Sequence, residues 1–397
     1  MTPDPTWRPP LLFRPAPAGM TFPSRPKVVL LLDSTEPSGV GEHVLTLARR
    51  LQGDADVTIA NVDLDRTGWA ERAATVVPTV QLGGPGDTCC RFVRFLDEVA
   101  PDILHIHAGI GWEALDVPAV ARACGVPVVL RTEHLPNVMT EPFHRATYAQ
   151  MGALLDAVVC VSAATRDSYR GAGVPRGRLR VIRNGVEPRP QARDRAATRH
   201  DLAVGAAPVL LTVARFSEQK GYPDLIDTAE IVLGQRPDAR FLWVGDGPTR
   251  PACGEILAAR GLDASVTLLG ARSDVGDLMA AADLLVSASR FEGHPLVVLE
   301  AMAAGLPVVA TRVPGTAEAV EHGVTGRLAP AADLGAAILA ALDAPAETAA
   351  YARAAQARAR RTFSAARMTA RALALYRSLL AEAVHRHAVA PNEAIAP

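Results

Sequence analysis

The chain has 397 residues, of which 49% are hydrophobic and 21% are charged, and its formal net charge is −1. Chains of this length usually divide into two domains, each with its own core. A net charge this close to zero argues against a nucleic-acid partner, and no apolar run reaches the ~18–20 residues that span a bilayer. The cysteines show no metal-ligand spacing and are odd in number, which is typical of a reduced, cytoplasmic protein.

Residues 1–25 are rich in proline and lack the long apolar stretch of a signal peptide, so we expect a flexible extension. The first predicted strand, 27–32, runs into a helical pattern that begins at Gly39 and Gly41. Glycines between a strand and a helix let the backbone approach a ligand, and they serve tight structural turns about as often. This loop alone therefore leaves a phosphate site and a plain turn both open.

Apolar runs alternate with helical patterns along the rest of the chain, which predicts parallel α/β sheets. We expect domains at 26–190 and 191–365, followed by a C-terminal helix and loose tail at 366–397. The composition of residues 346–388 is that of a helix. The predicted later strands are 57–60, 102–107, 127–132, 157–162, 179–183, 208–215, 241–245, 265–270, 283–288 and 307–311.

Polar side chains follow two predicted strands of the first unit. Ligands of open parallel sheets bind beyond the carboxyl ends of the strands, so His107, Glu133 and His134 are expected to face a common cleft on the acceptor side. His105 is expected to point into the packing of the sheet, because strand alternation places it deeper than His107. A single histidine is more often structural than catalytic, and His134, directly after a strand, is the better candidate.

The strand ends of the second unit carry cations and glycines. Arg215 ends strand 208–215, and Lys220 lies in the loop between this strand and a helix expected at 222–233. Two such cations suit a diphosphate. The alternative for this loop alone is a solvated surface. Gly245 and Arg272 follow the next two strands, and four consecutive strand ends with glycine or charge favour a binding site.

The segment 288–311 joins two glutamates to a helix. Glu292 lies in a loop, and Glu300 lies inside an apolar helix expected at 296–304, which Gly305 and Pro307 end. The free N–H groups at a helix start form an anion site. For an isolated pair, capping and a solvated face would be the preferred interpretation.

These motifs resemble the retaining glycosyltransferases of the GT-B fold, in the large family four that includes sucrose-phosphate synthase and bacterial mannosyltransferases. The resemblance runs from about residue 27 to 380 and is carried by SGVGEH, HIHAG, TEH, VSAAT, IRNGVE, ARFSEQKG, VGDGP, LLGARSD, FEGHPLVVLEAMAAGLPVVAT and VPGTAEAVEHGVTGRL. It implies two Rossmann-like parallel-sheet domains facing across a cleft, with a C-terminal helix crossing back to the first.

The resemblance also implies roles for the donor-binding residues. Arg215 and Lys220 would hold the donor diphosphate and stabilise the charge that grows on it. Glu300 would bind the ribose hydroxyls, and Glu292 would contact the donor sugar. The remaining contacts would come from the backbone of Gly293, His294, Leu296 and Val297, from Gly41 at the phosphate, and from Gly245 and Arg272 near the base.

The resemblance also bears on catalysis, on the fit of the sugar or acceptor and on the need for a metal ion. His134 would orient the donor sugar, while Glu292 is only a weak nucleophile candidate, so front-side attack and a short-lived covalent adduct both stay open. His294 departs from the family, which often has Phe, Leu or another apolar residue there, and this departure concerns sugar or acceptor fit. The pair Asp63 and Asp65 is interpreted as a solvated loop, so we expect no metal ion. We also expect no cofactor, because the nucleotide sugar is a co-substrate.

The function expected from the resemblance is transfer of a hexosyl group from a nucleotide sugar, with UDP favoured and GDP second. A nucleotide-sugar 2-epimerase and a non-catalytic nucleotide-sugar-binding regulator are the alternatives. The acceptor would be a small molecule, a glycan or a lipid-linked molecule. Weak peripheral membrane contact is left open by an arginine-rich C-terminal stretch and a cluster at Arg166, Arg170, Arg176, Arg178, Arg180, Arg183 and Arg189.

Overall fold

The structure is a computed structural model that describes residues 22–33, 39–62, 68–83 and 88–389. It divides into two compact units. Unit 1 comprises the chain up to Ile182 together with the segment from Met368, and unit 2 comprises Arg183–Arg367. Whether these units are the independently folding domains expected at 26–190 and 191–365 stays a prediction.

Unit 1 is built on a seven-stranded parallel sheet with the order β3-β2-β1-β4-β5-β6-β7. Its strands are β1 (Lys27–Leu32), β2 (Asp56–Asn61), β3 (Thr79–Gln81), β4 (Ile103–Ala108), β5 (Val128–Glu133), β6 (Ala157–Cys160) and β7 (Leu179–Val181). Its helices are α1 (Gly39–Leu51), α2 (Trp69–Ala74), α3 (Thr88–Val99), α4 (Val117–Ala123), α5 (Pro142–Gly152), α6 (Ala163–Tyr169), the short η1 (Arg176–Arg178) and most of α15 (Ala365–Val389). Alternate residues of β1 enter two different core clusters, because helices cover both faces of the sheet.

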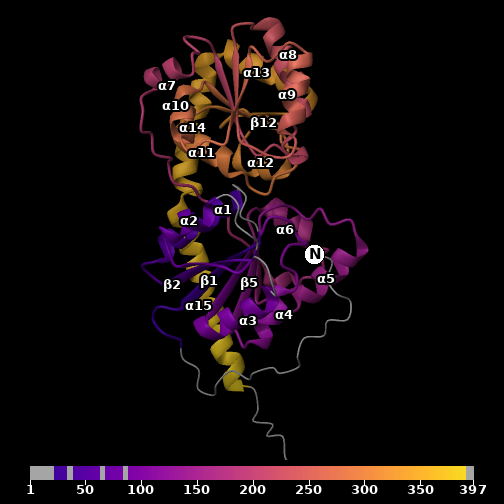
Figure 1. The fold of residues 1–397 in the computed structure, drawn as a ribbon, viewed down its shortest axis with the longest axis vertical. Coiled ribbons are helices and arrows are strands. Elements are labelled where there is room, and N and C mark those ends of the chain that lie inside the picture. Colours follow the sequence, from indigo (N-terminus) through magenta and orange to yellow (C-terminus); the bar gives the residue numbers. More distant parts are fainter. Residues whose placement is uncertain (1–21, 34–38, 63–67, 84–87, 390–397) are drawn as a thin grey trace, which may run out of the picture. The chain divides into compact units, whose positions relative to one another are not determined.

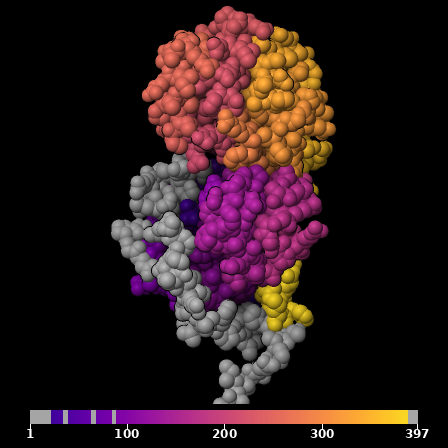
Figure 2. All heavy atoms as spheres, turned by 90° about the vertical axis from the view of Figure 1, so that its right-hand side faces the viewer, coloured from indigo at the N-terminus to yellow at the C-terminus, as the bar shows by residue number. Residues whose placement is uncertain are grey.

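Unit 2 is built on a six-stranded parallel sheet with the order β10-β9-β8-β11-β12-β13. Its strands are β8 (Val209–Val213), β9 (Arg240–Val244), β10 (Val266–Gly270), β11 (Leu284–Ser287), β12 (Val308–Thr311) and β13 (Arg327–Ala329). Its helices are α7 (Arg195–Asp201), η2 (Glu218–Lys220), α8 (Tyr222–Gln235), α9 (Arg250–Ala259), α10 (Val275–Ala281), α11 (Leu296–Ala304), α12 (Pro314–Ala319), η3 (Ala331–Asp333), α13 (Leu334–Asp343) and α14 (Pro345–Thr362). The earlier and later halves of this unit, coral and orange in Figure 2, lie side by side because their strands occupy opposite halves of the sheet.

The C-terminal stretch forms two helices rather than one continuous helix. After α14 ends, a break at Phe363 and Ser364 precedes α15, which packs on the same face of the unit 1 sheet as α1 and α2 (Figure 1). The Tyr376 hydroxyl of α15 lies 2.6 Å from His105 Nδ1. The expected return of the C-terminal helix to the first unit is therefore confirmed.

The predicted α/β architecture of two Rossmann-like parallel sheets is also confirmed, and it fixes where ligands can bind. The strand order reverses between β1 and β4 in unit 1 and between β8 and β11 in unit 2. Crevices beyond the carboxyl ends of strands at such switch points are the ligand sites of open α/β sheets.

No helix in the described part of the chain is both long enough and apolar enough to cross a bilayer.

Candidate functional site

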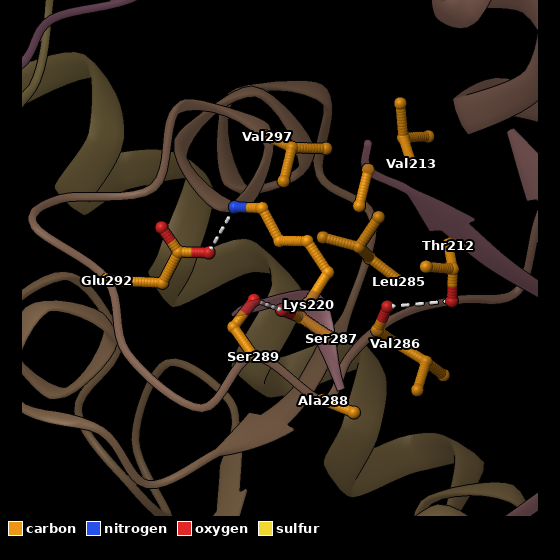
Figure 3. A pocket seen from close by; sticks show the side chains of 11 residues that line it. Thr212, Val213, Lys220, Leu285, Val286, Ser287, Ala288, Ser289, Glu292 and Val297 are labelled. Atoms are coloured by element: carbon orange, nitrogen blue, oxygen red, sulfur yellow. Dashed lines mark hydrogen bonds and ion pairs between the residues drawn. The ribbon is translucent and has the colours of Figure 1, made fainter. Parts of the chain in front are cut away.

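A pocket in unit 2 opens at the switch point of its sheet, between the carboxyl ends of β8 and β11. The chain reaches it from these two strands, from η2 and from the loop before α11. Figure 3 shows its lining, which consists of Thr212, Val213, Ala214, Lys220, Leu285, Val286, Ser287, Ala288, Ser289, Glu292 and Val297. Three of the residues expected from the sequence to bind the donor are thus brought together here: Lys220, Glu292 and Val297.

Lys220 and Glu292 form an ion pair inside this pocket. Lys220 Nζ lies 2.6 Å from Glu292 Oε1, and Figure 3 shows the lysine side chain directed at the carboxylate. The Lys220 side chain is 21% exposed and that of Glu292 is 6% exposed. An ammonium that solvent can reach is able to bind a phosphate, and a carboxylate beside it is able to accept hydrogen bonds from hydroxyls.

Close backbone contacts hold the loops of this pocket, and they explain three glycines. A Cβ on Gly221, which has φ +66°, would lie 2.2 Å from the Ala288 carbonyl oxygen. A Cβ on Gly245, which has φ +135°, would lie 2.0 Å from the Ala214 carbonyl oxygen. A Cβ on Gly315 would lie 2.2 Å from the Glu292 carbonyl oxygen. Only glycine fits where two backbones approach this closely. Gly245 thus allows its loop to pack against the loop after β8. Gly221 and Gly315 also shape the site, and they were not assigned to it from the sequence.

Helix α11 begins directly at the pocket. Leu296 and Val297 form its first turn, Gly293 in the preceding loop is buried, and Gly305 ends the helix with φ +76°. This matches the helix expected at 296–304. The N–H groups of the first turn are available as anion donors.

Glu300 lies inside α11 but outside the pocket lining. Its Oε1 is 2.8 Å from a terminal guanidinium nitrogen of Arg189, and its side chain is 11% exposed. Arg189 belongs to the cluster that left membrane contact open. Arg166 and Arg170 of that cluster both pair with Asp167, and Arg183 pairs with Glu318. Much of the cluster thus interacts within the protein.

The other two cations sit in different surroundings. Arg215 is exposed at the end of β8. Arg272, beyond β10, makes two contacts of 2.8 and 2.6 Å with the Asp274 carboxylate, and the hydrogen bonds from Arg272 lower the pKa of that carboxyl.

His294 is buried, and its ring does not line the pocket. The ring packs edge-on against Phe363 with 5.1 Å between centroids, and its backbone carbonyl accepts a 2.7 Å hydrogen bond from the Asn184 side chain. Neither ring nitrogen has a hydrogen-bond partner among the described residues. Burial, with Arg183 and Arg358 nearby, lowers the pKa of His294 to about 3, so the imidazole is neutral.

Unit 1 gathers three buried histidines, near the start of α1 and at the carboxyl ends of β4 and β5. His107 Nδ1 lies 3.2 Å from His134 Nε2, and the His43 ring meets the His134 ring edge-on at 4.7 Å. Burial, followed by the neighbouring imidazoles, lowers the pKa of His107 and His134 well below 6.5. Among the described residues, these three form the group whose ligand atoms, within 4.8 Å of one another, could hold a metal ion. His43 is a member that the sequence did not reveal.

His105 and Glu133, two further polar residues of the neighbouring strands β4 and β5, are both buried. His105 is a structural residue as expected, since its ring nitrogens contact Tyr376 and Thr132. Glu133 does not face a cleft with His134, because consecutive strand residues point to opposite faces of a sheet. Its side chain is completely buried beside Arg131 and accepts hydrogen bonds from the hydroxyls of Tyr148 and Tyr169.

The other unit 1 candidate, Gly41, is covered by an aromatic ring. A Cβ at this position would lie 2.7 Å from Trp69 Nε1, so α2 packs closely over the start of α1. The pair Asp63 and Asp65 lies outside the described residues, as do residues 1–21 and 390–397 of the two expected flexible ends.

Comparison with known proteins identifies the family. Residues 207–344 match the family described as "Glycosyl transferases group 1", and residues 37–189 match "Glycosyltransferase Family 4". The chain belongs to the group 1 glycosyltransferases. The resemblance inferred from the motifs is thereby confirmed, and the pocket with Lys220 and Glu292 lies in the part that matches the group 1 family.

Two relatives from Streptomyces illustrate the group 1 family. The chain is 29% identical over 245 residues to an alpha-D-kanosaminyltransferase of Streptomyces kanamyceticus, covering 57% of this chain and 64% of the relative. It is 33% identical over 264 residues to a 2-deoxystreptamine N-acetyl-D-glucosaminyltransferase of Streptomyces fradiae, covering 62% of each. The first curated relatives are matched over between 32% and 64% of their own length.

A solved structure shows the same fold. The Anabaena protein HepE, in complex with UDP-glucose, superposes with a TM-score of 0.76 over 89% of this chain and 100% of that one, at 24% sequence identity. Together with the two parallel sheets, this likeness assigns the GT-B fold expected from the sequence.

Proposed function

We propose that this group 1 glycosyltransferase transfers a hexosyl group from a nucleotide sugar to an acceptor hydroxyl, with retention of configuration and without a metal ion. A UDP-sugar is the favoured donor and a GDP-sugar the second. The observation that carries the proposal is the Lys220–Glu292 pair at the switch point of unit 2, 2.6 Å apart in a pocket that the start of α11 adjoins.

The cations and the helix start serve the leaving group. A nucleoside diphosphate leaves with growing negative charge, which Lys220, Arg215 and the free N–H groups of α11 would stabilise. Donor binding would exchange the Glu292 contact of Lys220 for a phosphate oxygen. This reaction requires fixed positive charge at the phosphate more than it requires a general acid.

The carboxylates serve the two sugars of the donor. Glu292, released from Lys220, would accept hydrogen bonds from hydroxyls of the transferred hexose. Glu300 would bind the ribose hydroxyls, with Arg189 holding its carboxylate in place. From unit 1 we propose His134 as the residue that orients the sugar, with His107 fixing its ring through the 3.2 Å contact.

The acceptor is proposed to be a small polar molecule handled in the cytoplasm. One relative is named for 2-deoxystreptamine. The internal pairing of Arg166, Arg170 and Arg183 argues for a surface without strong attraction to anionic lipid. Peripheral membrane contact would then be weak at most.

Thermal-shift screening with UDP-, GDP-, ADP- and TDP-sugars tests the donor. A ligand that binds only the folded protein stabilises it by about RT ln(1 + [L]/Kd). We expect the largest shift with UDP-sugars and a smaller one with GDP-sugars. If none of these donors shifts the melting temperature at millimolar concentration, the proposal is wrong.

A further inference from the structure

An exposed aromatic surface in unit 1 plays no part in the donor site. Trp112 is 40% exposed and Phe143 is 59% exposed, and they are the aromatic members of the set of large exposed hydrophobic residues in the described chain. The His144 ring stacks on Trp112 with 5.6 Å between centroids and 18° between planes, and it lies 6.0 Å from the Phe143 ring. We refer to Trp112, Phe143 and His144 as the aromatic surface.

The aromatic surface lies at the edge of the sheet where the candidate histidines end their strands. Trp112 follows β4, which carries His107, and Phe143 and His144 open α5 after β5, which leads into His134. Strands β4 and β5 are neighbours in the sheet and run parallel. The aromatic surface is therefore built on the carboxyl-end loops of the same two strands.

A buried guanidinium fixes the loop that presents Trp112. Arg131 has no exposed surface and donates hydrogen bonds to the carbonyl oxygens of Gly111, at 3.2 Å, and Glu113, at 2.6 Å. These carbonyls belong to the residues on either side of Trp112. A Cβ on Gly111 would lie 2.8 Å from the Tyr169 hydroxyl, so this loop is packed tightly beneath the ring.

The same buried group fixes the helix that presents the other two rings. Arg131 Nε lies 2.5 Å from Glu133 Oε1, which accepts a 2.9 Å hydrogen bond from the Tyr148 hydroxyl of α5. Burying a charged pair costs several kcal/mol per ion unless every hydrogen-bonding group is satisfied. Here the pair joins the loop after β4 to helix α5, and these two elements carry the exposed aromatic rings. Such an arrangement is suited to holding a preformed binding surface.

The charge around the aromatic surface is negative. Segments 109–116 and 137–147 present two exposed carboxylates, Asp116 and Glu141, against one exposed arginine, Arg145. The Glu113 carboxylate instead accepts a 2.6 Å hydrogen bond from the Gly109 backbone N–H, and burial raises its pKa. The Arg145 Nε is engaged with the Met139 carbonyl oxygen at 2.8 Å. Aromatic faces attract ammonium groups, and acidic neighbours add to that attraction, whereas an anionic membrane would be repelled.

We infer that the aromatic surface binds the acceptor and that the acceptor is an amino sugar or aminocyclitol. This inference rests on the proposed glycosyl transfer and names its acceptor class. The C–H face of the ring stacks on Trp112 and His144, and its ammonium groups lie toward the rings and the carboxylates. Arg131 and Glu133 are positioning residues for this surface.

Isothermal titration with 2-deoxystreptamine tests the inference on the full chain. We expect Trp112→Ala to weaken binding by roughly tenfold and Trp112→Phe by roughly threefold or less, because a phenyl ring retains part of the cation–π attraction. Phe143→Ala should weaken it by a smaller factor. The matched control is Ile231→Ala, an exposed apolar residue of unit 2 (46% exposed) that should leave binding unchanged.

Titration with myo-inositol, a neutral ring polyol, shows how much the ammonium groups of the ligand contribute to binding. We expect it to bind more weakly than 2-deoxystreptamine, and Glu141→Gln to weaken only the cationic ligand. An unchanged dissociation constant in Trp112→Ala, or no binding of 2-deoxystreptamine and glucosamine, would overturn the inference. The inference would also be overturned if the protein sedimented with phosphatidylglycerol vesicles and Trp112→Ala abolished this sedimentation, because the aromatic surface would then bind lipid. A UDP-glucose thermal shift on the same samples separates these outcomes from failure of the proposed transfer.

Discussion

Two carboxylate–cation pairs, one at the carboxyl end of each sheet, differ in their surroundings. In unit 2, Lys220 and Glu292 meet in a pocket, and the lysine side chain remains 21% exposed. In unit 1, Arg131 and Glu133 have no exposed surface, and both are occupied by further hydrogen bonds within the unit. A ligand can separate the first pair, whereas nothing from solvent reaches the second.

This difference shows that a charged residue at a strand end has two uses. A partly exposed pair with few other partners can exchange its contact for a phosphate or a hydroxyl. A buried pair in which every group is satisfied stabilises the loops around it and is too costly to break. Substitutions in the two pairs should accordingly affect different measurements.

The largest effect should come from the buried pair. Arg131→Leu leaves the Glu133 carboxylate buried without its cation, which should lower the free energy of unfolding by about 3–5 kcal/mol. Urea denaturation measures this loss. The double variant Arg131→Leu/Glu133→Leu should recover a large part of it, and Arg260→Ala, which breaks an exposed pair with Asp227, should have little effect. Equal losses in the single and double variants would contradict this account.

The pair in the pocket should affect turnover more than stability. In the proposed function Lys220 stabilises the developing charge of the leaving diphosphate, and loss of one such interaction in Lys220→Ala should cost about 10²–10³ in kcat. Product formation from UDP-glucose under single-turnover conditions measures the effect, and the melting temperature of each variant controls for folding. Near-normal turnover in both Lys220→Ala and Glu292→Gln would show that the site is assigned wrongly.

Glu300 should affect donor affinity and leave the chemical step nearly unchanged. In the proposed function Glu300 makes a charge-assisted contact to the ribose, so Glu300→Gln should raise KM for the donor by about tenfold with kcat nearly constant. Steady-state kinetics at varied donor concentration measures both constants. A fall in kcat at constant KM would instead place Glu300 at the reacting centre.

The smallest effect concerns His294. Its pKa of about 3 in the folded protein lies below the value near 6.5 in an unfolded chain, so below pH 6.5 the unfolded chain binds the proton that the folded protein does not. The wild type should therefore lose about 1.4 kcal/mol of stability per pH unit through this residue as the pH falls below 6.5. His294→Leu should abolish this contribution to the pH dependence of the free energy of unfolding. Urea denaturation of both proteins at pH 7.5 and 5.5 measures the difference. An identical pH dependence in both proteins would contradict it.

Local patterns in the sequence predicted the strands with long apolar runs, such as Lys27–Leu32, and the helix Leu296–Ala304 with its glycine end. The edge strands Thr79–Gln81 and Arg327–Ala329 were missed, because three residues carry too little periodicity to distinguish a strand from a loop. The C-terminal helix was expected to begin at 366, and α15 begins at Ala365.

The site was harder to predict than the fold, because side-chain partners depend on contacts between distant residues. Lys220 and Glu292 were recognised individually, but their contact spans 72 residues. Glu133 was grouped with His134 by its place at the end of the strand, although alternation sends the two side chains to opposite faces. His43 gave no signal of its own, since its partners come from β4 and β5.

The central claim is that Lys220 contacts the donor diphosphate while Glu292 contacts the sugar, and titration with UDP and UDP-glucose tests it directly. Lys220→Ala should weaken the binding of both ligands. Glu292→Gln should weaken UDP-glucose by roughly tenfold, the loss of about one charge-assisted hydrogen bond. It should not weaken UDP, because Lys220 leaves Glu292 when it binds the phosphate. Equal weakening of UDP and UDP-glucose by Glu292→Gln, or unchanged binding of both in Lys220→Ala, would contradict the claim.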